Sequence, residues 1–202
     1  ATVKIEVNGT KRGIIGDTVD MSLCAKAKDE FNMGCKARTV SFTQLYGGKI
    51  TAALSRQHPR DLFDCKYMDI SSFEDVKDGF MLCLLGSDKP IIESLQPNEI
   101  DQTDALEKQF EGMSDIAFSY EDYKQARLQL VKLVQEGMTK ADKDFLLSFE
   151  EGCPDWSLCS AGDLSKYPSV QWKLLNIRNL KEHNIQKHEQ GIKKLKDFLF
   201  PK

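Results

Sequence analysis

Long apolar runs are missing from this chain of 202 residues. No run approaches the ~20 apolar residues that a helix needs to cross a bilayer. No basic, apolar and small-residue leader marks the chain for secretion either. We therefore expect a cytoplasmic protein with no membrane partner. Hydrophobic residues at 41% and charged residues at 29% are typical of a soluble protein with a real core, in one or two domains.

Cysteines at metal-ligand spacing are also missing. The six cysteines form no Cys-x-x-Cys pair and have no histidine partners arranged as in a zinc site. Scattered cysteines of this kind are typical of reduced, mostly buried thiols. We expect that state for Cys153 and Cys159 as well, rather than a metal or disulfide role.

The beginning of the chain predicts strands. Residues 2–7 alternate between polar and apolar side chains, and Asn8-Gly9 follows as a turn. Short apolar runs at residues 21–24 and 39–42 predict further strands around a connecting loop. Because the chain begins inside this sheet, we expect the natural protein to hold further sequence before it.

Residues 42–68, FTQLYGGKITAALSRQHPRDLFDCKYM, are the most specific stretch of the chain. Gly47 and Gly48 are expected to loosen the approach to it. Pro59 lacks the N–H that an uninterrupted helix needs, and its fixed φ suits a first helical position. The stretch therefore predicts two helices, residues 43–57 and 59–67.

The charged side chains of this stretch are expected to converge. Lys49 and Arg56 lie about 20° apart around the first helix, so they share a face. The bend before the second helix then brings Lys49 within reach of Asp64. Spacing alone leaves an alternative open, in which Arg60 and Asp64 form an exposed structural salt bridge worth ~0.3–0.5 kcal/mol.

The run GGKITAALSRQHPRDLFD resembles the K-x-x-A-x-x-x-R-x-x-x-R-D-x-x-D signature of the AbiEii/AbiGii nucleotidyltransferase toxins, the enzyme half of type IV toxin–antitoxin pairs. The runs FLLSFEEGCPDWSL and PSVQWKLLNIRNL resemble the C-terminal part of the same family. The resemblance implies an α+β fold, a partial nucleotidyltransferase-like sheet followed by a mainly helical domain. Residues 1–68 would be a remnant of the nucleotidyltransferase core, and residues 69–202 the helical C-terminal domain.

The resemblance also implies roles for single residues. Lys49 and Asp64 would be catalytic. Lys49, Arg56 and Arg60 would bind the nucleotide, with Arg60 orienting Asp64, whereas Asp61 would cap or pair locally. The reaction would be attack of an RNA or protein hydroxyl on the α-phosphate of a nucleoside triphosphate (NTP), with Mg²⁺ present. The implied partners are the NTP, an RNA acceptor such as tRNA, and a cognate antitoxin.

The Gly-rich loop and the metal-binding Asp-x-Asp strand of that family have no counterpart before Phe42. Glu6 occupies a plausible place for a third metal-binding carboxylate; the alternative is a solvent-facing glutamate on an edge strand. We therefore expect this chain to be inactive alone. The alternative function is a stand-alone helical interaction module descended from such an enzyme.

Charge is distributed unevenly along the rest of the chain. Residues 93–122 contain nine acids and one lysine, which predicts a solvated surface or a contact for a basic partner. Residues 171–202 contain eight Lys or Arg against three acids. This basic end is either the polar face of a packed helix or a contact for the RNA backbone.

Helical spacing predicts the remaining elements. Helices are expected from Ser72 to a stop at Gly86, over residues 120–137, and after Thr139, where Asp142 completes a capping box. Two more are expected from Pro168 onward. The core side chains of these last two helices are predicted to be Val170, Trp172, Leu174, Leu175, Ile177, Ile185, Ile192, Leu195 and Leu199.

Overall fold

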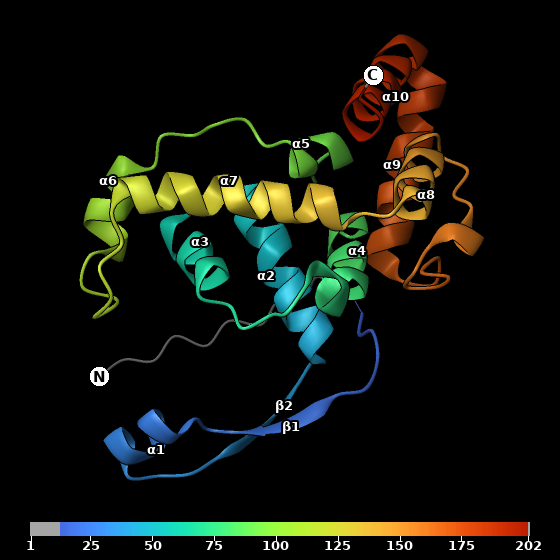
Figure 1. Cartoon of the computed structure of the whole chain (residues 1–202). Helices are drawn as coiled ribbons and strands as arrows, with labels where there is room; N and C mark the ends of the chain where they lie inside the picture. Colours follow the sequence, from blue (N-terminus) through green and yellow to red (C-terminus); the bar gives the residue numbers. More distant parts are fainter. Residues whose placement is uncertain (1–12, 202) are drawn as a thin grey trace.

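A small antiparallel sheet precedes a body built from helices (Figure 1). The computed structural model describes residues 13–201. Its architecture confirms the predicted α+β class. The strand predicted over residues 2–7 and the candidate ligand Glu6 lie outside the described residues. The division into domains at residue 68 stays a prediction.

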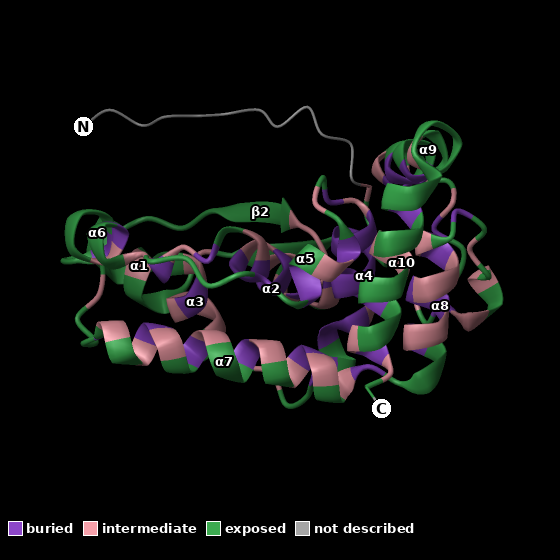
Figure 2. Ribbon diagram, turned by 90° about the horizontal axis from the view of Figure 1, so that it is seen from above, coloured by how far each residue is buried: buried purple, intermediate pink, exposed green. Residues whose placement is uncertain are grey.

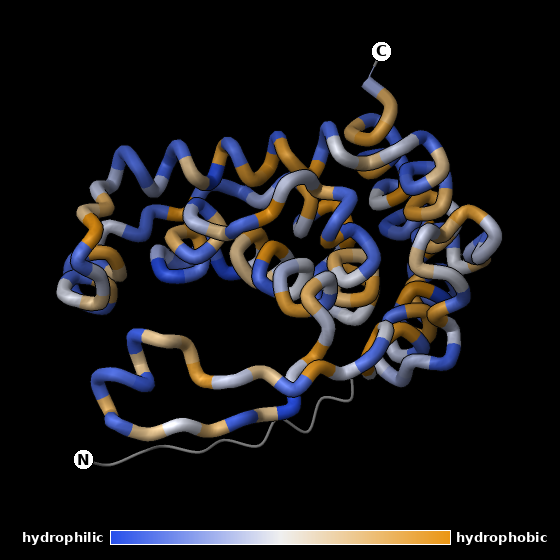
Figure 3. Tube along the Cα trace, turned by 60° about the horizontal axis from the view of Figure 1, so that its bottom comes forward, coloured by the Kyte–Doolittle hydropathy of each residue, from blue (hydrophilic) through white to orange (hydrophobic). Residues whose placement is uncertain are grey.

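A β–α–β arm, residues 17–40, leads into the body. Strand β1 (Val19–Ser22) pairs antiparallel with β2 (Lys36–Thr39), and helix α1 (Ala25–Phe31) connects them. The two predicted strands are present, but each begins earlier in the chain than expected, and their connection contains a helix. Although the arm carries apolar stretches (Figure 3), none of its residues is buried.

Helix α2 (Phe42–Arg56) crosses helix α4 (Lys77–Leu85) with backbone against backbone. A Cβ atom on Gly47 would lie 2.1 Å from the backbone nitrogen of Phe80, and one on Gly79 would lie 2.1 Å from the carbonyl oxygen of Thr43. The expectation that Gly47 loosens the approach to the helix is therefore wrong. Gly47 lies inside α2, where the missing side chain lets α4 come close.

The predicted bend between the two signature helices is present. Helix α2 ends at Gln57, whose φ of +52° is left-handed, and α3 (Pro59–Lys66) begins directly after His58. Pro59 takes the first helical position, as expected. The His58 ring accepts a hydrogen bond from the Arg60 backbone N–H at 3.2 Å, which caps α3.

Side chains of α7 (Tyr120–Gly137) hold this bend. The Tyr123 hydroxyl donates to the carbonyl oxygen of Gln57 at 3.1 Å, and Arg127 Nε donates to its side-chain oxygen at 2.8 Å. The Gln57 side-chain amide donates to the carbonyl oxygen of Asn98 at 2.6 Å. The polar atoms of a buried, left-handed residue are thus satisfied, which a buried bend requires.

The helices predicted after residue 72, over residues 120–137, after Thr139 and from Pro168 are confirmed, and both Ser119 and Thr139 form capping boxes. The remaining elements are η1 (Phe73–Val76), α5 (Ile91–Leu95), α6 (Thr103–Ala105), the π-helical turn η2 (Leu106–Phe110), α8 (Lys140–Glu150), η3 (Trp156–Leu158), α9 (Pro168–His183) and α10 (Ile185–Leu199).

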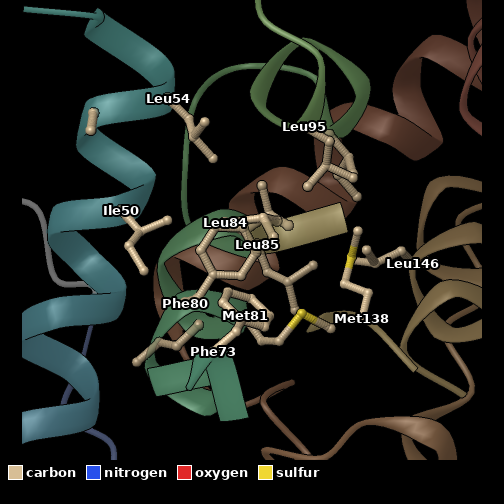
Figure 4. Packing of buried hydrophobic residues seen from close by; sticks show 14 of the residues in the cluster. Ile50, Leu54, Phe73, Phe80, Met81, Leu84, Leu85, Leu95, Met138 and Leu146 are labelled. Carbon is tan, nitrogen blue, oxygen red and sulfur yellow. The ribbon is translucent and has the colours of Figure 1, made fainter. Parts of the chain in front are cut away.

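The hydrophobic core lies where α2, α4, α5, α7 and α8 meet. Figure 4 shows Ile50 and Leu54 of α2 against Phe80 and Leu84 of α4, and all four side chains are at most 1% exposed. The core prediction for the C-terminal helices needs correction. Trp172 is 65% exposed and Leu175 is also exposed, because the side of α9 that packs on the body carries Val170, Leu174 and Ile177. Ile185, the first residue of α10, is exposed as well.

Lys173 is a buried cation that the sequence did not single out. Its ammonium group donates to the carbonyl oxygens of Leu84 and Lys89 at 2.9 and 2.7 Å and to Ser87 Oγ at 3.0 Å. It therefore caps the end of α4. Burial lowers the pKa of Lys173 to about 8, while Glu150 opposes the shift.

Replacing Gly47 by alanine is expected to lower the free energy of unfolding by about 1–3 kcal/mol, because the new methyl group would overlap the α4 backbone. Gly48→Ala is the matched control. Its Cβ would lie 3.4 Å from Cys83 Sγ, an ordinary contact, and loss of a helical glycine should raise stability by about 0.5–1 kcal/mol. Urea unfolding of both variants measures the difference. Equal effects at the two positions would contradict the close crossing.

The buried Lys173 predicts a dependence of stability on pH. Its folded pKa of about 8 lies below the ordinary lysine pKa of 10.5, so the unfolded chain binds more protons between these two values. The contribution of Lys173 to stability should therefore rise with pH across that window. Urea unfolding of wild type and Lys173→Met from pH 7 to 10 isolates it, because thiols and other groups cancel in the difference. A difference independent of pH would contradict the shifted pKa.

Candidate functional site

Lys49 and Asp64 meet on the face shared by α2 and α3. Lys49 Nζ lies 2.6 Å from Asp64 Oδ2, and the two side chains are 38% and 39% exposed. The expectation that the bend brings these residues together is confirmed. A cation and a carboxylate fifteen positions apart in the sequence thus form one half-exposed pair, open to a ligand from the solvent.

A second ion pair lies beside the first, closer to the bend. Arg56 Nη2 is 3.0 Å from Asp61, whose side chain is only 13% exposed. Asp61 therefore pairs locally, as expected, but its partner is the arginine that was expected to hold the nucleotide. One Asp61 oxygen, Oδ2, is buried without a hydrogen bond, although it lies 3.0 Å from Arg56 Nη2. Arg56 Nη2 and Asp61 Oδ2 therefore attract each other by charge, without a hydrogen bond between them.

The alternative suggested by spacing alone, a salt bridge between Arg60 and Asp64, does not form in the structure. The Arg60 side chain is exposed, and among the described residues it makes no ion pair. The Asp64 carboxylate pairs with Lys49 instead, so among the described residues no ion pair between Arg60 and Asp64 supports the expected role of Arg60 in orienting Asp64. The proposed nucleotide-binding roles of Arg56 and Arg60 remain predictions.

The two ion pairs balance the charges of Lys49 and Arg56, whereas the exposed Arg60 has no ion-pair partner among the described residues. Two cations on α2 are matched by two carboxylates on α3 in antiparallel order. A phosphate can therefore bind Lys49 strongly only by taking the place of Asp64. At this exposure the pair itself is weak, so an anion of higher charge can compete for the lysine.

Cys65, next to Asp64, is not a nucleophile at neutral pH. Burial raises the pKa of its thiol to about 12, and the neighbouring Asp64 charge adds to the shift. All six cysteines are free thiols, as expected. The expectation that they are mostly buried is wrong. Only Cys83 and Cys159 are buried, while three others lie in the exposed arm and the turn after α8: Cys24, Cys35 and Cys153.

The sequence did not predict an apolar surface patch on α2, formed by Phe42, Leu45 and Tyr46 before Lys49. The rings of Phe42 and Tyr46 lie 4.5 Å apart, and Phe42 and Leu45 are 49% and 44% exposed. Their spacing of three and four residues from one another and from Lys49 was visible, but it was equally compatible with a buried stripe.

The sequence also gave no indication of the Gln57 clamp, the hydrogen bonds from Tyr123 and Arg127 that hold the bend at Gln57. No local signal marks contacts to Tyr123 and Arg127, some seventy residues away.

The described residues do not provide a metal centre. They contain no group of three or more His, Cys, Asp or Glu side chains arranged to hold an ion. An Asp-x-Asp spacing does occur in α8, but Asp142 is buried against Lys77 and Thr139, whereas Asp144 pairs with Lys140 on the surface. These two carboxylates cannot share one ion. The Mg²⁺ expected from the resemblance therefore has no ligand set in residues 13–201.

A groove of about 1020 Å³ lies elsewhere, between α5, α7, α8 and α10. Its walls carry charges of both signs, from Glu93, Lys143, Lys194 and Asp197. Neither Lys49 nor Asp64 lines it. We give the ion pairs precedence as the candidate site, since charge and geometry converge there.

Comparison with known protein families decides the relationship. The family described as "Nucleotidyl transferase AbiEii toxin, Type IV TA system" matches residues 1–174. The chain belongs to the AbiEii family. Membership supports a nucleotidyltransferase-like toxin and implies an antitoxin partner. The match covers the arm, the α2–α3 signature and the helices up to the first half of α9, and residues 175–202 lie beyond it.

No curated protein and no solved structure matches the chain. Among the described residues, no helix is long and apolar enough to cross a membrane. The AbiEii assignment therefore rests on the family match and on the signature residues that the structure places together.

The Lys49–Asp64 pair is expected to contribute little to folding. A double-mutant cycle with Lys49→Met and Asp64→Asn should give a coupling free energy of about 0.2–1 kcal/mol, because both side chains are more than a third exposed. Arg60→Met with Asp64→Asn is the control cycle and should give no coupling. Urea unfolding measures both cycles. A larger coupling for the second would show that Arg60 is the true partner.

Proposed function

We propose that this chain carries the lysine–aspartate part of a nucleotidyltransferase toxin, which transfers a nucleotide from an NTP to a hydroxyl group of RNA or protein. One observation carries the proposal: Lys49 and Asp64, which the resemblance makes the signature lysine and aspartate, form a half-exposed pair at 2.6 Å.

The chemistry of the pair fits phosphate transfer. The acceptor hydroxyl oxygen forms a bond to the α-phosphorus and loses its proton to solvent, while the bond from that phosphorus to the pyrophosphate oxygen breaks and pyrophosphate leaves. Negative charge spreads over the phosphate oxygens in the transition state, where a fixed cation stabilises it. Lys49 supplies a compact charge, and Asp64 holds that ammonium group in place until the triphosphate replaces the carboxylate.

The second pair has a supporting role in this proposal. Arg56 stays bound to the largely buried Asp61, so it can contact a phosphate with its remaining N–H groups without leaving its partner. Arg60, exposed one turn before Asp64, can reach the same substrate from solvent. Both arginines would bind the nucleotide rather than take part in the bond changes.

We propose that the chain is inactive alone. Nucleotidyl transfer of this kind uses Mg²⁺ held by carboxylates, and the described residues offer no such set. The metal ligands would come from residues beyond those described, with Glu6 as our candidate within this chain. The acceptor would be RNA such as tRNA, reached in the cytoplasm, with the basic α9–α10 end near its backbone.

The test is binding of a labelled NTP, followed by transfer to total RNA in the presence of Mg²⁺. The chain should bind the NTP, and Lys49→Ala should weaken binding about tenfold or more, because a charge-assisted contact is lost. Asp64→Asn should leave binding intact or strengthen it. Lys132→Ala removes an equal charge on the exposed side of α7 and should change nothing.

Transfer should be absent with this chain alone and present with the complete gene product. If the complete gene product carrying Lys49→Ala transferred label at the wild-type rate, the catalytic role of Lys49 would be rejected. If wild type fails to bind NTP and the complete gene product transfers no label, the alternative holds, a helical interaction module that has kept the signature pair as a structural contact.

A further inference from the structure

A hollow of about 330 Å³ opens in the acidic segment, far in sequence from the signature residues. It lies between the π-helical turn after α6 and the start of α7, in a region that is mostly exposed (Figure 2). Its lining residues are Leu106, Glu107, Phe110, Glu111, Gly112, Ser114, Ile116, Ala117 and Phe118.

The floor of this hollow is apolar and aromatic. Phe110 and Phe118 are 6% and 9% exposed, and their rings lie 5.5 Å apart. Both rings also contact Phe63 of α3, with centroids at 5.1 and 5.4 Å. Three mutually packed aromatic rings therefore form a base against which an apolar side chain can be buried.

The rim of the hollow is acidic. Glu107 and Glu111 are exposed, and neither forms an ion pair within residues 13–201. The neighbouring cations are already engaged: Lys108 pairs with Asp104 and Lys26 with Asp115. Lys66, whose ammonium group lies 5.6 Å from the centroid of the Phe118 ring, pairs with Asp122. Residues 99–115 contain six acids and one lysine. This charge repels the phosphates of RNA and attracts Lys and Arg side chains.

Two further observations distinguish the hollow from an ordinary solvated loop. Met113 and Ile116 beside it are 59% and 51% exposed, so large apolar side chains point into solvent within an acidic setting. Leu106–Phe110 form a π-helical turn, closed by a bond from Glu111 N–H to the carbonyl oxygen of Leu106 at 3.1 Å. Such turns are rare and are frequent at functional sites.

We propose that this hollow binds a basic segment of a partner protein, with one large apolar side chain seated on the Phe110–Phe118 floor and Lys or Arg side chains on Glu107 and Glu111. Burial of the anchor supplies affinity, and the carboxylates select a cationic partner. The surface goes beyond the proposed nucleotidyl transfer, because it shares no residue with the Lys49–Asp64 pair.

The probe is the blocked peptide Lys-Lys-Phe-Lys-Lys, titrated into the isotope-labelled chain and followed by amide chemical shifts. It should perturb residues 106–118. The peptide with Gly in place of Phe should bind about tenfold more weakly, because it lacks the anchor. The peptide Glu-Glu-Phe-Glu-Glu should not bind. Raising the salt concentration to 1 M should weaken the Lys-Lys-Phe-Lys-Lys complex, because the contacts are between exposed charges.

Matched variants separate the rim from the overall charge. Glu107→Gln with Glu111→Gln should weaken the peptide at least about fivefold, since two charge contacts are lost. Glu182→Gln with Glu189→Gln changes the net charge equally on α9 and α10 and should leave binding unchanged. Ile116→Ser should weaken the Phe peptide and leave the Gly peptide unchanged, because it alters only the apolar wall.

Four outcomes would overturn the proposal. One is equal binding of the Phe and Gly peptides, and another is equal weakening by the two glutamate double variants. The third is dimerisation in sedimentation that is lost both with Glu107→Gln/Glu111→Gln and with Lys193→Gln/Lys194→Gln, since the occupant would then be the basic α10 helix of a second copy. An RNA oligonucleotide that perturbs residues 106–118 would likewise reject a protein partner.

Discussion

The contact of two helix backbones at Gly47 and Gly79 is the constraint on which the rest of this structure depends. Without side chains between them, α2 and α4 approach so closely that α2 has one permitted position and rotation on the body. Ile50 and Leu54 then point into the core, and Lys49 points out of it. The rotation of α2 therefore decides which residues of the signature stay accessible.

The bend at Gln57 adds the second constraint, because it sets the direction of α3. Successive residues of α3 point about 100° apart and serve three environments. Leu62 enters the core, Phe63 joins the aromatic cluster, and Asp64 meets Lys49. The clamp from Tyr123 and Arg127 keeps these assignments fixed, so the long helix α7 supports the ion pairs although none of its residues takes part in them.

The signals that predicted the structure correctly were local. Pro59 marked the start of α3, capping pairs marked α7 and α8, and spacing around the helix placed Lys49 within reach of Asp64. The sequence did not predict what depends on distant partners. Glutamine gives no sign of a left-handed φ, and Trp172 has the helical spacing of a core residue although it faces solvent. The two exposed strands begin earlier in the chain than predicted, because no core fixes their register.

The distribution of charge follows from these constraints and separates two kinds of surface. On the α2–α3 face Asp61 and Asp64 each have a cation within 3.0 Å, so Lys49 is released from its carboxylate only by exchange with a ligand. On the rim of the acidic hollow, Glu107 and Glu111 lack such partners within residues 13–201 and attract cations directly. Phe63 and Asp64 are neighbours on α3. Phe63 packs against the floor of the acidic hollow, whereas Asp64 belongs to the α2–α3 face. The proposed phosphate ligand and the proposed basic protein segment would therefore contact different sides of one short helix, and neither would compete for the other's contacts.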